Sequence, residues 1–395
     1  MNGLYCFFTL FLSVWWAGCS EKPPLSGSIQ VPSGDVWANA VYLVQPRTLD
    51  EVATSFAGQV LDTAIVQADG RFVFSKMPNA PEPILLVLTV QKKGERFANR
   101  LENDDLTTAN YFPIVWKNGD HLEVTAIAEQ FQRSFTILQP TSENTALLQL
   151  RDARHRAFQT FREHSGPDDH DESQLLEKEA ALLKFQQASM DFAQQTPHLL
   201  PALVAFRWAS PENDYERLPE FLFSQCEKWK TAHNDHPWTV QLCQKSNRTQ
   251  LAVMKGDQFP DVSLPMRSGD TTALRALLGE RLTIVDLWAS WCGPCRRENR
   301  EVLVPLWEKH HSRGLQIIGY ALDSSKDAWE KAIDKDGAYR WPHASHLQGD
   351  DSPLMETLRI RTIPANFILD GQGNVVAKNL HGETLVQLVE EMMGK

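Results

Sequence analysis

The chain has 395 residues, more than one hydrophobic core usually serves, so two or three domains are expected. Hydrophobic residues make up 42% and charged residues 23% of the chain, values typical of soluble globular proteins. The formal net charge is −11, which excludes attraction to nucleic acid or to an anionic membrane surface through the overall field. Attachment to a membrane would therefore need a specific anchor.

An uncharged, mostly apolar run extends from Leu4 to Gly18. It is too short for a comfortable transmembrane helix but has the length of the hydrophobic part of an export signal. The run ends in Ala17-Gly18-Cys19 and resembles a bacterial lipoprotein signal, in which a lipidated cysteine becomes the new N-terminus. The resemblance implies a signal peptide over residues 1–18, lipidation at Cys19, and a membrane-anchored lipoprotein of the cell envelope that faces the periplasm. An uncleaved anchor and a buried N-terminal helix are the alternatives.

Short apolar or alternating segments separated by turn signals follow, within a region of residues 19–130. Asp69-Gly70 and Asn118-Gly119 are two of these turns. Several short strands at this spacing predict a β-rich N-terminal domain of the β-sandwich type. The predicted strands cover Val41–Val44, Arg71–Phe74, Ile84–Val90, Phe112–Trp116 and His121–Val124.

The hydrophobic period changes in the middle of the chain, over residues 140–250. Apolar residues there recur three and four positions apart, which predicts an α-helical region. Cys226 and Cys243 fall on the last two predicted helices. If these helices fold back on each other, the two cysteines can form a structural disulfide; buried free thiols are the alternative. The predicted helices cover Ala146–Glu163, Ser173–Gln194, Arg217–Ala232 and Pro237–Asn247.

Strands and helices alternate over residues 253–395, which predicts an α/β domain and makes the chain a multidomain protein. Thr283–Trp288 is the strand expected to be buried, a helix is predicted from Cys295 to His311, and Asp370–Gly373 turns a hairpin. The other predicted elements cover Leu315–Leu322, Lys326–Lys335, Pro353–Ile360, Asn366–Leu369, Val375–Lys378 and Thr384–Met393.

The sequence Trp291-Cys292-Gly293-Pro294-Cys295 follows the buried strand and opens a helix. Two cysteines three positions apart at a helix start lie on one face and are close enough to bridge. Unpaired N–H groups and the positive end of the helix favour an anion at the first cysteine, and only the thiolate is nucleophilic. Cys292 is therefore the predicted attacking thiol and Cys295 the resolving thiol. Gly293 permits a tight turn, and Pro294 suits the first turn, where its missing N–H is not needed.

Together with Ile363-Pro364 before the hairpin, this string resembles a thioredoxin-fold active site. The pattern from about Gly256 onward resembles the TlpA/ResA-like branch of thiol–disulfide oxidoreductases, and the region before it is similar to the small β-domain of many anchored TlpA-like proteins. The resemblance implies a C-terminal thioredoxin fold with a cis Ile363-Pro364 bond against the dithiol, whose backbone groups bind an extended substrate. It also implies substrate contacts at Trp291, Gly293 and Pro294.

The same resemblance implies roles for two acidic residues. Asp286, six residues before Cys292, would accept the proton of Cys295, and burial would raise its pKa. A satisfied structural aspartate is the alternative. Glu298 matches a glutamate that ResA-like proteins place near the cysteines, although Arg296-Arg297-Glu298 can also form a solvated helix surface.

These features predict a thiol–disulfide oxidoreductase of the cell envelope that reduces disulfides in exported proteins, such as apocytochrome, with electrons from a membrane donor. No cofactor is expected besides the redox-active disulfide, and no metal, because a structural zinc site needs four ligands. The dithiol motif disfavours a peroxiredoxin-type peroxidase. The Gly-Pro pair is that of thioredoxin, whose low potential favours a reductant. A disulfide isomerase or oxidant, and a partner-binding lipoprotein with an incidental redox domain, are the alternatives.

Overall fold

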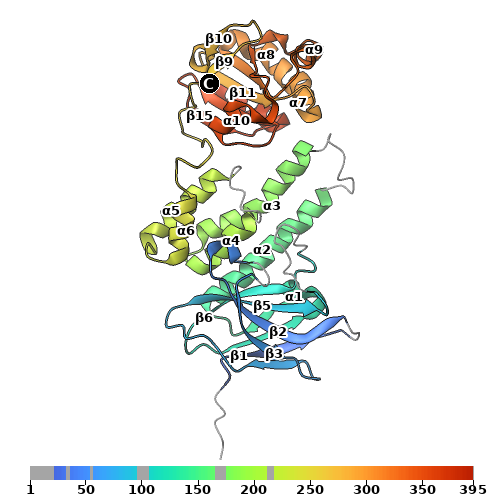
Figure 1. The fold of residues 1–395 in the computed structure, drawn as a ribbon, viewed down its shortest axis with the longest axis vertical. Coiled ribbons are helices and arrows are strands. Elements are labelled where there is room, and N and C mark those ends of the chain that lie inside the picture. The colour runs from blue at the N-terminus through green and yellow to red at the C-terminus, as the bar shows by residue number, and fades with distance from the viewer. Residues whose placement is uncertain are drawn as a thin grey trace, which may run out of the picture.

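The three parts of the chain follow one another along its longest axis. A computed structural model describes residues 22–32, 36–53, 57–95, 106–164, 175–210 and 218–394. In Figure 1 a β-rich part lies at one end, helices lie in the middle, and an α/β domain lies at the other end. The signal peptide expected over residues 1–18 and the lipidation expected at Cys19 lie outside the described residues. Among the helices described, none combines the length and the apolar character needed to cross a membrane.

The β-rich part of the described chain contains two four-stranded sheets. Its strands are β1 (Leu25–Gln30), β2 (Trp37–Gln45), β3 (Gln59–Ile65), β4 (Arg71–Phe74), β5 (Ile84–Lys92), β6 (Tyr111–Trp116), β7 (Leu122–Ile127) and β8 (Thr136–Leu138). The strand orders are β4-β1-β7-β8 and β3-β2-β5-β6. Strand β7 alternates buried and exposed residues, so one face of its sheet packs on the core. Strand β8 pairs antiparallel with β7, so this sheet continues past residue 130, the boundary predicted from the sequence.

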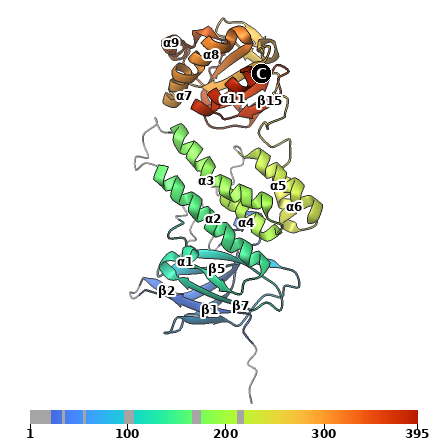
Figure 2. The same ribbon diagram turned by 180° about the vertical axis from the view of Figure 1, so that it is seen from behind.

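The middle part is helical, as the periodicity predicts. Its helices are α2 (Ser142–His164), α3 (Leu175–Gln195), α4 (Leu199–Ala209), α5 (Pro219–Ala232) and α6 (Pro237–Lys245), preceded by the short α1 (Phe131–Ser134). Figure 2 shows α2 and α3 as a hairpin that runs from the sheets toward the C-terminal domain. Helix α4 was not predicted from the sequence. Every one of its residues is buried, so its sequence has no polar face and no helical period.

The helices and the sheets share one hydrophobic core. Asn144 of α2 binds the backbone of β6: its carboxamide oxygen accepts from the Val115 N–H at 2.9 Å and its amide donates to the Val115 carbonyl at 2.7 Å. This caps an edge strand that would otherwise present unpaired backbone groups. Trp208 of α4 donates from Nε1 to the Tyr111 hydroxyl at 3.0 Å. The two regions predicted as separate therefore form one folded unit with a continuous buried cluster.

The C-terminal part is an α/β domain around a five-stranded sheet with the order β13-β12-β11-β14-β15. Its strands are β9 (Ser263–Pro265), β10 (Thr271–Ala273), β11 (Leu282–Trp288), β12 (Leu315–Ala321), β13 (His343–Ala344), β14 (Ala365–Asp370) and β15 (Val375–Lys378). Its α-helices are α7 (Gly293–Glu298), α8 (Val304–His310), α9 (Lys326–Asp336), α10 (Pro353–Leu358) and α11 (Gly382–Gly394). Strand β11 is central and buried at all seven positions, parallel to β12 and antiparallel to β14.

The helix predicted from Cys295 to His311 is divided. Helix α7 ends at Glu298, a π-helical segment covers Asn299–Leu303, and α8 follows. Pro305 lies in the first turn of α8 and has no N–H to donate to a preceding carbonyl, which accounts for the change of hydrogen-bond period just before it. The result is a bulge directly after the predicted redox motif.

The C-terminal domain has its own hydrophobic core, separate from that of the first unit. Polar groups join the two units. Lys378 of β15 contacts Glu220 of α5 at 3.0 Å and the Val253 carbonyl at 3.1 Å. Arg248 pairs with Asp257 at 2.6 Å across the connecting segment. Polar junctions of this kind resemble transient interfaces, which permit relative motion of the domains.

Candidate active site

Cys292 and Cys295 are joined by a disulfide between the end of β11 and the start of α7. Cys292 is the N-cap of α7, and its sulfur accepts a hydrogen bond from the Cys295 N–H at 3.3 Å. Pro294 occupies the first turn, where no N–H is needed. In the reduced protein, this N–H and the positive end of the helix would stabilise a thiolate at Cys292. The structure thus places both cysteines where the motif predicts them.

A polar network holds the loop that precedes Cys292. The Ser290 N–H donates to the buried Asp323 carboxylate at 2.9 Å, and the Ser290 hydroxyl also donates to it. Arg296 donates to the Ser290 carbonyl at 3.1 Å and to Asp336 at 2.8 Å. The fully buried Asp336 carboxylate also accepts from Arg300 at 2.9 Å. Sequence reasoning missed this network because its residues come from segments far apart in the sequence and form no motif.

Asp286 lies on β11, the buried central strand, opposite Gly319 of β12 and Asn366 of β14. Burial removes water from its carboxyl group and raises its pKa well above the usual range, and the negative charge of Glu298 raises the pKa further. A carboxyl in this condition holds a proton at pH values where exposed aspartates are ionised. It can therefore exchange a proton with a thiol, because the pKa of a thiol also lies above that of an exposed carboxyl group.

Glu298 ends α7 and is buried, so its interpretation as a solvated helix surface is wrong. Its carboxylate accepts from Nδ1 of His381 at 2.8 Å and from the Gly382 N–H at 3.1 Å. Because its charge acts on Asp286, the two carboxyl groups belong to one electrostatic site beside the dithiol. Sequence reasoning did not find His381, a single histidine 83 positions away from Glu298 with no motif around it.

Ile363-Pro364 is a cis peptide bond and precedes β14. Since Ala365 pairs with Leu287, this bond lies beside the end of β11, where the cysteine loop begins. Trp291 is 61% exposed and Ile363 is half-buried, so both offer surface to a ligand near the dithiol. Gly293 is exposed, whereas Pro294 is buried.

The structure also answers the question that the sequence left open for the second cysteine pair. Cys226 of α5 and Cys243 of α6 are bonded, with their Cα atoms 5.0 Å apart, so these thiols are not free. Helices α5 and α6 fold back on each other to bring them together. Within the described residues, no three His, Cys, Asp or Glu side chains converge as a metal site would require.

The central strand, the Cys-x-x-Cys loop that opens a helix, and the cis proline beside it define a thioredoxin-like domain of the thiol–disulfide oxidoreductase class. Residues 255–378 match the AhpC/TSA family. The chain is 25% identical over 149 residues to the thioredoxin-like protein YneN of Bacillus subtilis, covering 37% of this chain and 82% of that protein.

The chain is also similar to a second relative and to a solved structure. The thiol:disulfide interchange protein DsbE of Pseudomonas fluorescens is 29% identical over 120 residues, which cover 30% of this chain and 63% of that protein, less than two thirds of its length. A solved thiol–disulfide oxidoreductase from Bacteroides fragilis is 29% identical, with 34% of this chain and 98% of that chain covered and a TM-score of 0.32. The AhpC/TSA match lies within the C-terminal domain, and the N-terminal unit is outside it.

Proposed function

We propose that this protein is a thiol–disulfide oxidoreductase of the cell envelope that reduces disulfides in exported proteins. The observation that carries the proposal is the Cys292–Cys295 pair at the start of α7, with the Cys292 sulfur on a backbone N–H and the carboxyl of Asp286 buried on the neighbouring strand. An incidental pair of cysteines has no need of a buried carboxyl whose pKa is raised.

The reaction follows from these positions. The Cys292 thiolate attacks one sulfur of a substrate disulfide and forms a mixed disulfide, while the other substrate sulfur leaves as a thiolate. Cys295 then gives its proton to the ionised form of Asp286 and attacks the Cys292 sulfur. The second substrate sulfur leaves, and the Cys292–Cys295 disulfide forms. Two electrons have passed to the substrate, so a dithiol donor must reduce the protein before the next turnover.

Three groups around the dithiol form the proposed substrate surface. Backbone groups at Ile363-Pro364 would pair with an extended substrate segment in the manner of an added strand. The exposed ring of Trp291 provides an apolar contact next to the attacking sulfur. Gly293 adds no side chain that would keep a substrate backbone away.

The proposed location rests on disulfide use and on the N-terminal segment. The Cys226–Cys243 pair, which lies outside the redox motif, is bonded, as is common in compartments outside the cytoplasm. Lipidation at Cys19 would hold the protein at a membrane, where a membrane-bound donor could supply electrons to Cys292–Cys295. In the N-terminal unit, the two sheets with their shared core fit the β-sandwich type, and a role in positioning the redox domain is part of the proposal.

Reduction of insulin disulfides by the full chain, supplied with dithiothreitol, tests the activity. We expect turnover by the native protein and background rates for Cys292→Ala. Equal rates for the two proteins would reject the proposed enzymatic activity and favour a partner-binding lipoprotein. Equilibration of the Cys292/Cys295 couple with glutathione tests the direction. A potential near about −270 mV supports a reductant, and one near about −120 mV would make the protein an oxidant.

A further inference from the structure

We propose that the Cys226–Cys243 disulfide is a second redox centre, which receives electrons from the Cys292/Cys295 dithiol of the same chain. This inference rests on the proposed function, because it needs Cys292 to attack disulfides. It assigns to the helical part of the protein a substrate role in thiol–disulfide exchange, in addition to the stabilisation that any disulfide provides.

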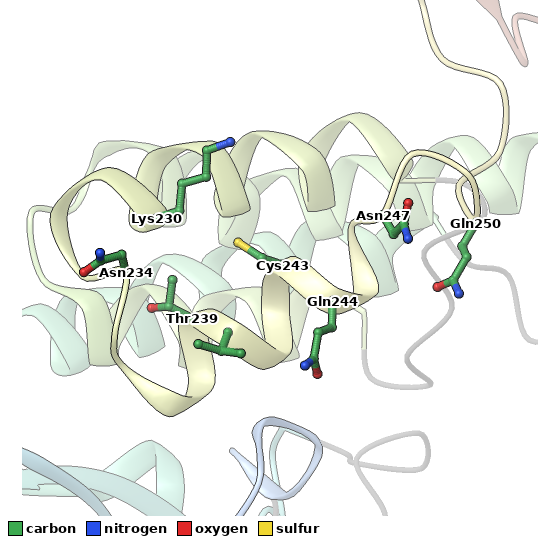
Figure 3. Close-up of a pocket in the computed structure, with 8 residues that line it drawn as sticks. Lys230, Asn234, Thr239, Cys243, Gln244, Asn247 and Gln250 are labelled. Carbon is green, nitrogen blue, oxygen red and sulfur yellow. The ribbon is translucent and has the colours of Figure 1, made fainter.

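Cys243 of this disulfide lies at the wall of a groove over α5 and α6 (Figure 3). The groove has a volume of about 710 Å³. Cys243 lines it and is partly exposed, whereas Cys226 is 5% exposed and does not line it. Cys243 is therefore the more accessible cysteine of the pair, and Cys226 is the shielded one. The lining residues are Lys230, Asn234, Thr239, Val240, Cys243, Gln244, Asn247 and Gln250.

The groove contains a buried polar group without a protein partner. Thr239 lines it and is only 1% exposed, and its hydroxyl oxygen makes no hydrogen bond within the described chain. An unpaired buried hydroxyl costs free energy that a ligand can recover. A backbone N–H or carbonyl of an incoming polypeptide segment would supply that partner, four positions before Cys243 on α6.

The difference in exposure favours one direction of attack. Cys243 lines the groove and is partly exposed, whereas Cys226 is buried. Lys230, one helical turn after Cys226 on α5, also lines the groove, and its ammonium group is paired with the Glu227 carboxylate. Attack at the Cys243 sulfur with departure of Cys226 therefore fits the exposure of the two residues.

The exchange balances in electrons and protons. The Cys292 thiolate attacks the Cys243 sulfur, the Cys226–Cys243 bond breaks, and the electron pair leaves on Cys226, which takes up a proton. Cys295 then loses its proton and attacks the Cys292 sulfur, which releases Cys243 as a thiolate to be protonated. The Cys292–Cys295 pair is oxidised by two electrons and the Cys226–Cys243 pair is reduced by two.

The occupant of the groove is the chain's own C-terminal domain. Helix α6 ends at Lys245 and the first strand of that domain begins at Ser263, so a short segment tethers the two centres. A short tether raises the effective concentration of one group at the other to about the millimolar range. The two units have separate cores and meet through polar contacts such as Lys378–Glu220, which allows the domain to turn toward the groove.

A kinetic experiment tests the transfer. The fully oxidised chain receives one equivalent of dithiothreitol, and samples are quenched with acid, alkylated and mapped by mass spectrometry. We expect Cys226–Cys243 to be reduced at least about tenfold more slowly in the Cys292→Ser, Cys295→Ser double variant than in the native chain. Equal rates would overturn the inference. Insulin reduction by the same native preparation keeps the two proposals apart, since its loss would reject the proposed function itself.

A trapping experiment tests which sulfur is attacked. Of the two cysteine pairs, the variant Cys295→Ser, Cys226→Ser keeps Cys292 and Cys243, and its matched control Cys295→Ser, Cys243→Ser keeps Cys292 and the shielded Cys226. After incubation with oxidised glutathione, we expect the Cys292–Cys243 link to form with a yield that does not depend on protein concentration. Absence of the link, an equal yield in the control, or a yield proportional to concentration would each overturn the assignment.

Discussion

The two disulfides of this protein lie in contrasting surroundings. The Cys292–Cys295 disulfide lies at the first turn of a helix, where a backbone N–H donates a hydrogen bond to the Cys292 sulfur. Two buried carboxyl groups, those of Asp286 and Glu298, lie in the same site. Cys226–Cys243 joins the bodies of two helices, 17 positions apart, beside a polar groove. The comparison shows that the bond alone does not make a catalyst. The first pair has groups that stabilise a thiolate and move a proton, whereas the second offers only an accessible sulfur.

The same contrast extends to the two folded units. The C-terminal unit builds its site on a central strand whose seven residues are all buried, so Asp286 is held without freedom to reorient. The N-terminal unit spreads one core over two sheets and the helices that cover them. Its helices carry the second disulfide near the junction with the C-terminal unit. Variants in either unit can therefore test which properties belong to each disulfide.

Replacement of the attacking cysteine should have the largest effect. Cys292→Ser removes the nucleophile, so insulin reduction should fall by a factor on the order of 10³ or more. The activity of Cys295→Ser should fall as well, but this variant should accumulate mixed disulfides with its substrate because nothing resolves them. Measurement of turnover and of trapped adducts by mass spectrometry separates the two roles. Adducts on Cys295 in the Cys292→Ser variant would reverse the assignment.

Replacement of the buried carboxyl should have the next largest effect. Asp286→Asn keeps the shape of the side chain but cannot accept the proton of Cys295, so turnover should fall by about 10²-fold. In the native protein the rate should rise with pH as Asp286 ionises, and because its pKa is raised, that rise should occur above the usual range for aspartate. The pH–rate profile of Asp286→Asn should lack this rise. An unchanged profile would leave Asp286 a structural residue.

The same variant should change the pH dependence of stability. Because the folded protein holds the Asp286 carboxyl neutral at pH values where the unfolded chain ionises it, the native protein loses stability as the pH rises from about 4 toward the raised pKa. The slope in that window is about 1.4 kcal/mol per pH unit. Asp286→Asn should therefore be more stable than the native protein at pH 7 and gain nothing below about pH 4. Urea unfolding at several pH values measures both proteins, and a pH-independent difference would contradict the expectation.

The sequence was sufficient for the parts of the site that depend on spacing. The Cys292–Cys295 interval, the strand that carries Asp286 and the Ile363-Pro364 turn are short-range patterns, and the structure brings them to one end of β11. Contacts across long intervals could not be predicted. His381 contacts Glu298 only because α11 begins beside α7 in the folded domain. No local sequence pattern predicts such a contact.

Elements of the fold that lack a local sequence pattern could not be predicted either. Helix α4 has no polar face, so its sequence contains no period to detect. Strand β8 has three residues, which is too short for alternation to be recognised, and the boundary at residue 130 therefore fell inside the β-rich part. Amphipathic α2 and α3 were predictable because each has one face in the core and one in solvent.

Glu298 should modulate the site more weakly than Asp286. Its charge is the second cause of the raised pKa of Asp286, after burial, so Glu298→Gln should lower that pKa only part of the way toward the usual value. The pH at which turnover rises should shift downward, with a change of severalfold or less in the maximal rate. The pH–rate profile measures this shift, and an upward shift would show that the charge of Glu298 acts differently on the site.

Two variants of His381 test the hydrogen bond that this residue makes to the Glu298 carboxylate. His381→Ala removes the donor at 2.8 Å from a buried carboxylate and should cost about 1–3 kcal/mol of stability. His381→Gln keeps an N–H that can reach the carboxylate and should recover part of the loss. Chemical denaturation of both variants, each with insulin turnover as a second readout, tests this. Equal stability of the alanine variant and the native protein would mean that the Gly382 N–H alone holds Glu298.

The smallest effect is expected at the junction between the two units. Lys378→Met removes the contacts of the ammonium group with Glu220 and the Val253 carbonyl but keeps an apolar stem over the junction. Partly exposed ion pairs contribute about 0–1 kcal/mol, so the unfolding midpoint and insulin turnover should hardly change. Electron transfer from Cys292/Cys295 to Cys226–Cys243 should accelerate, because the domain turns more freely toward the groove. Slower transfer would show instead that the Lys378–Glu220 contact holds the two disulfides in a productive arrangement.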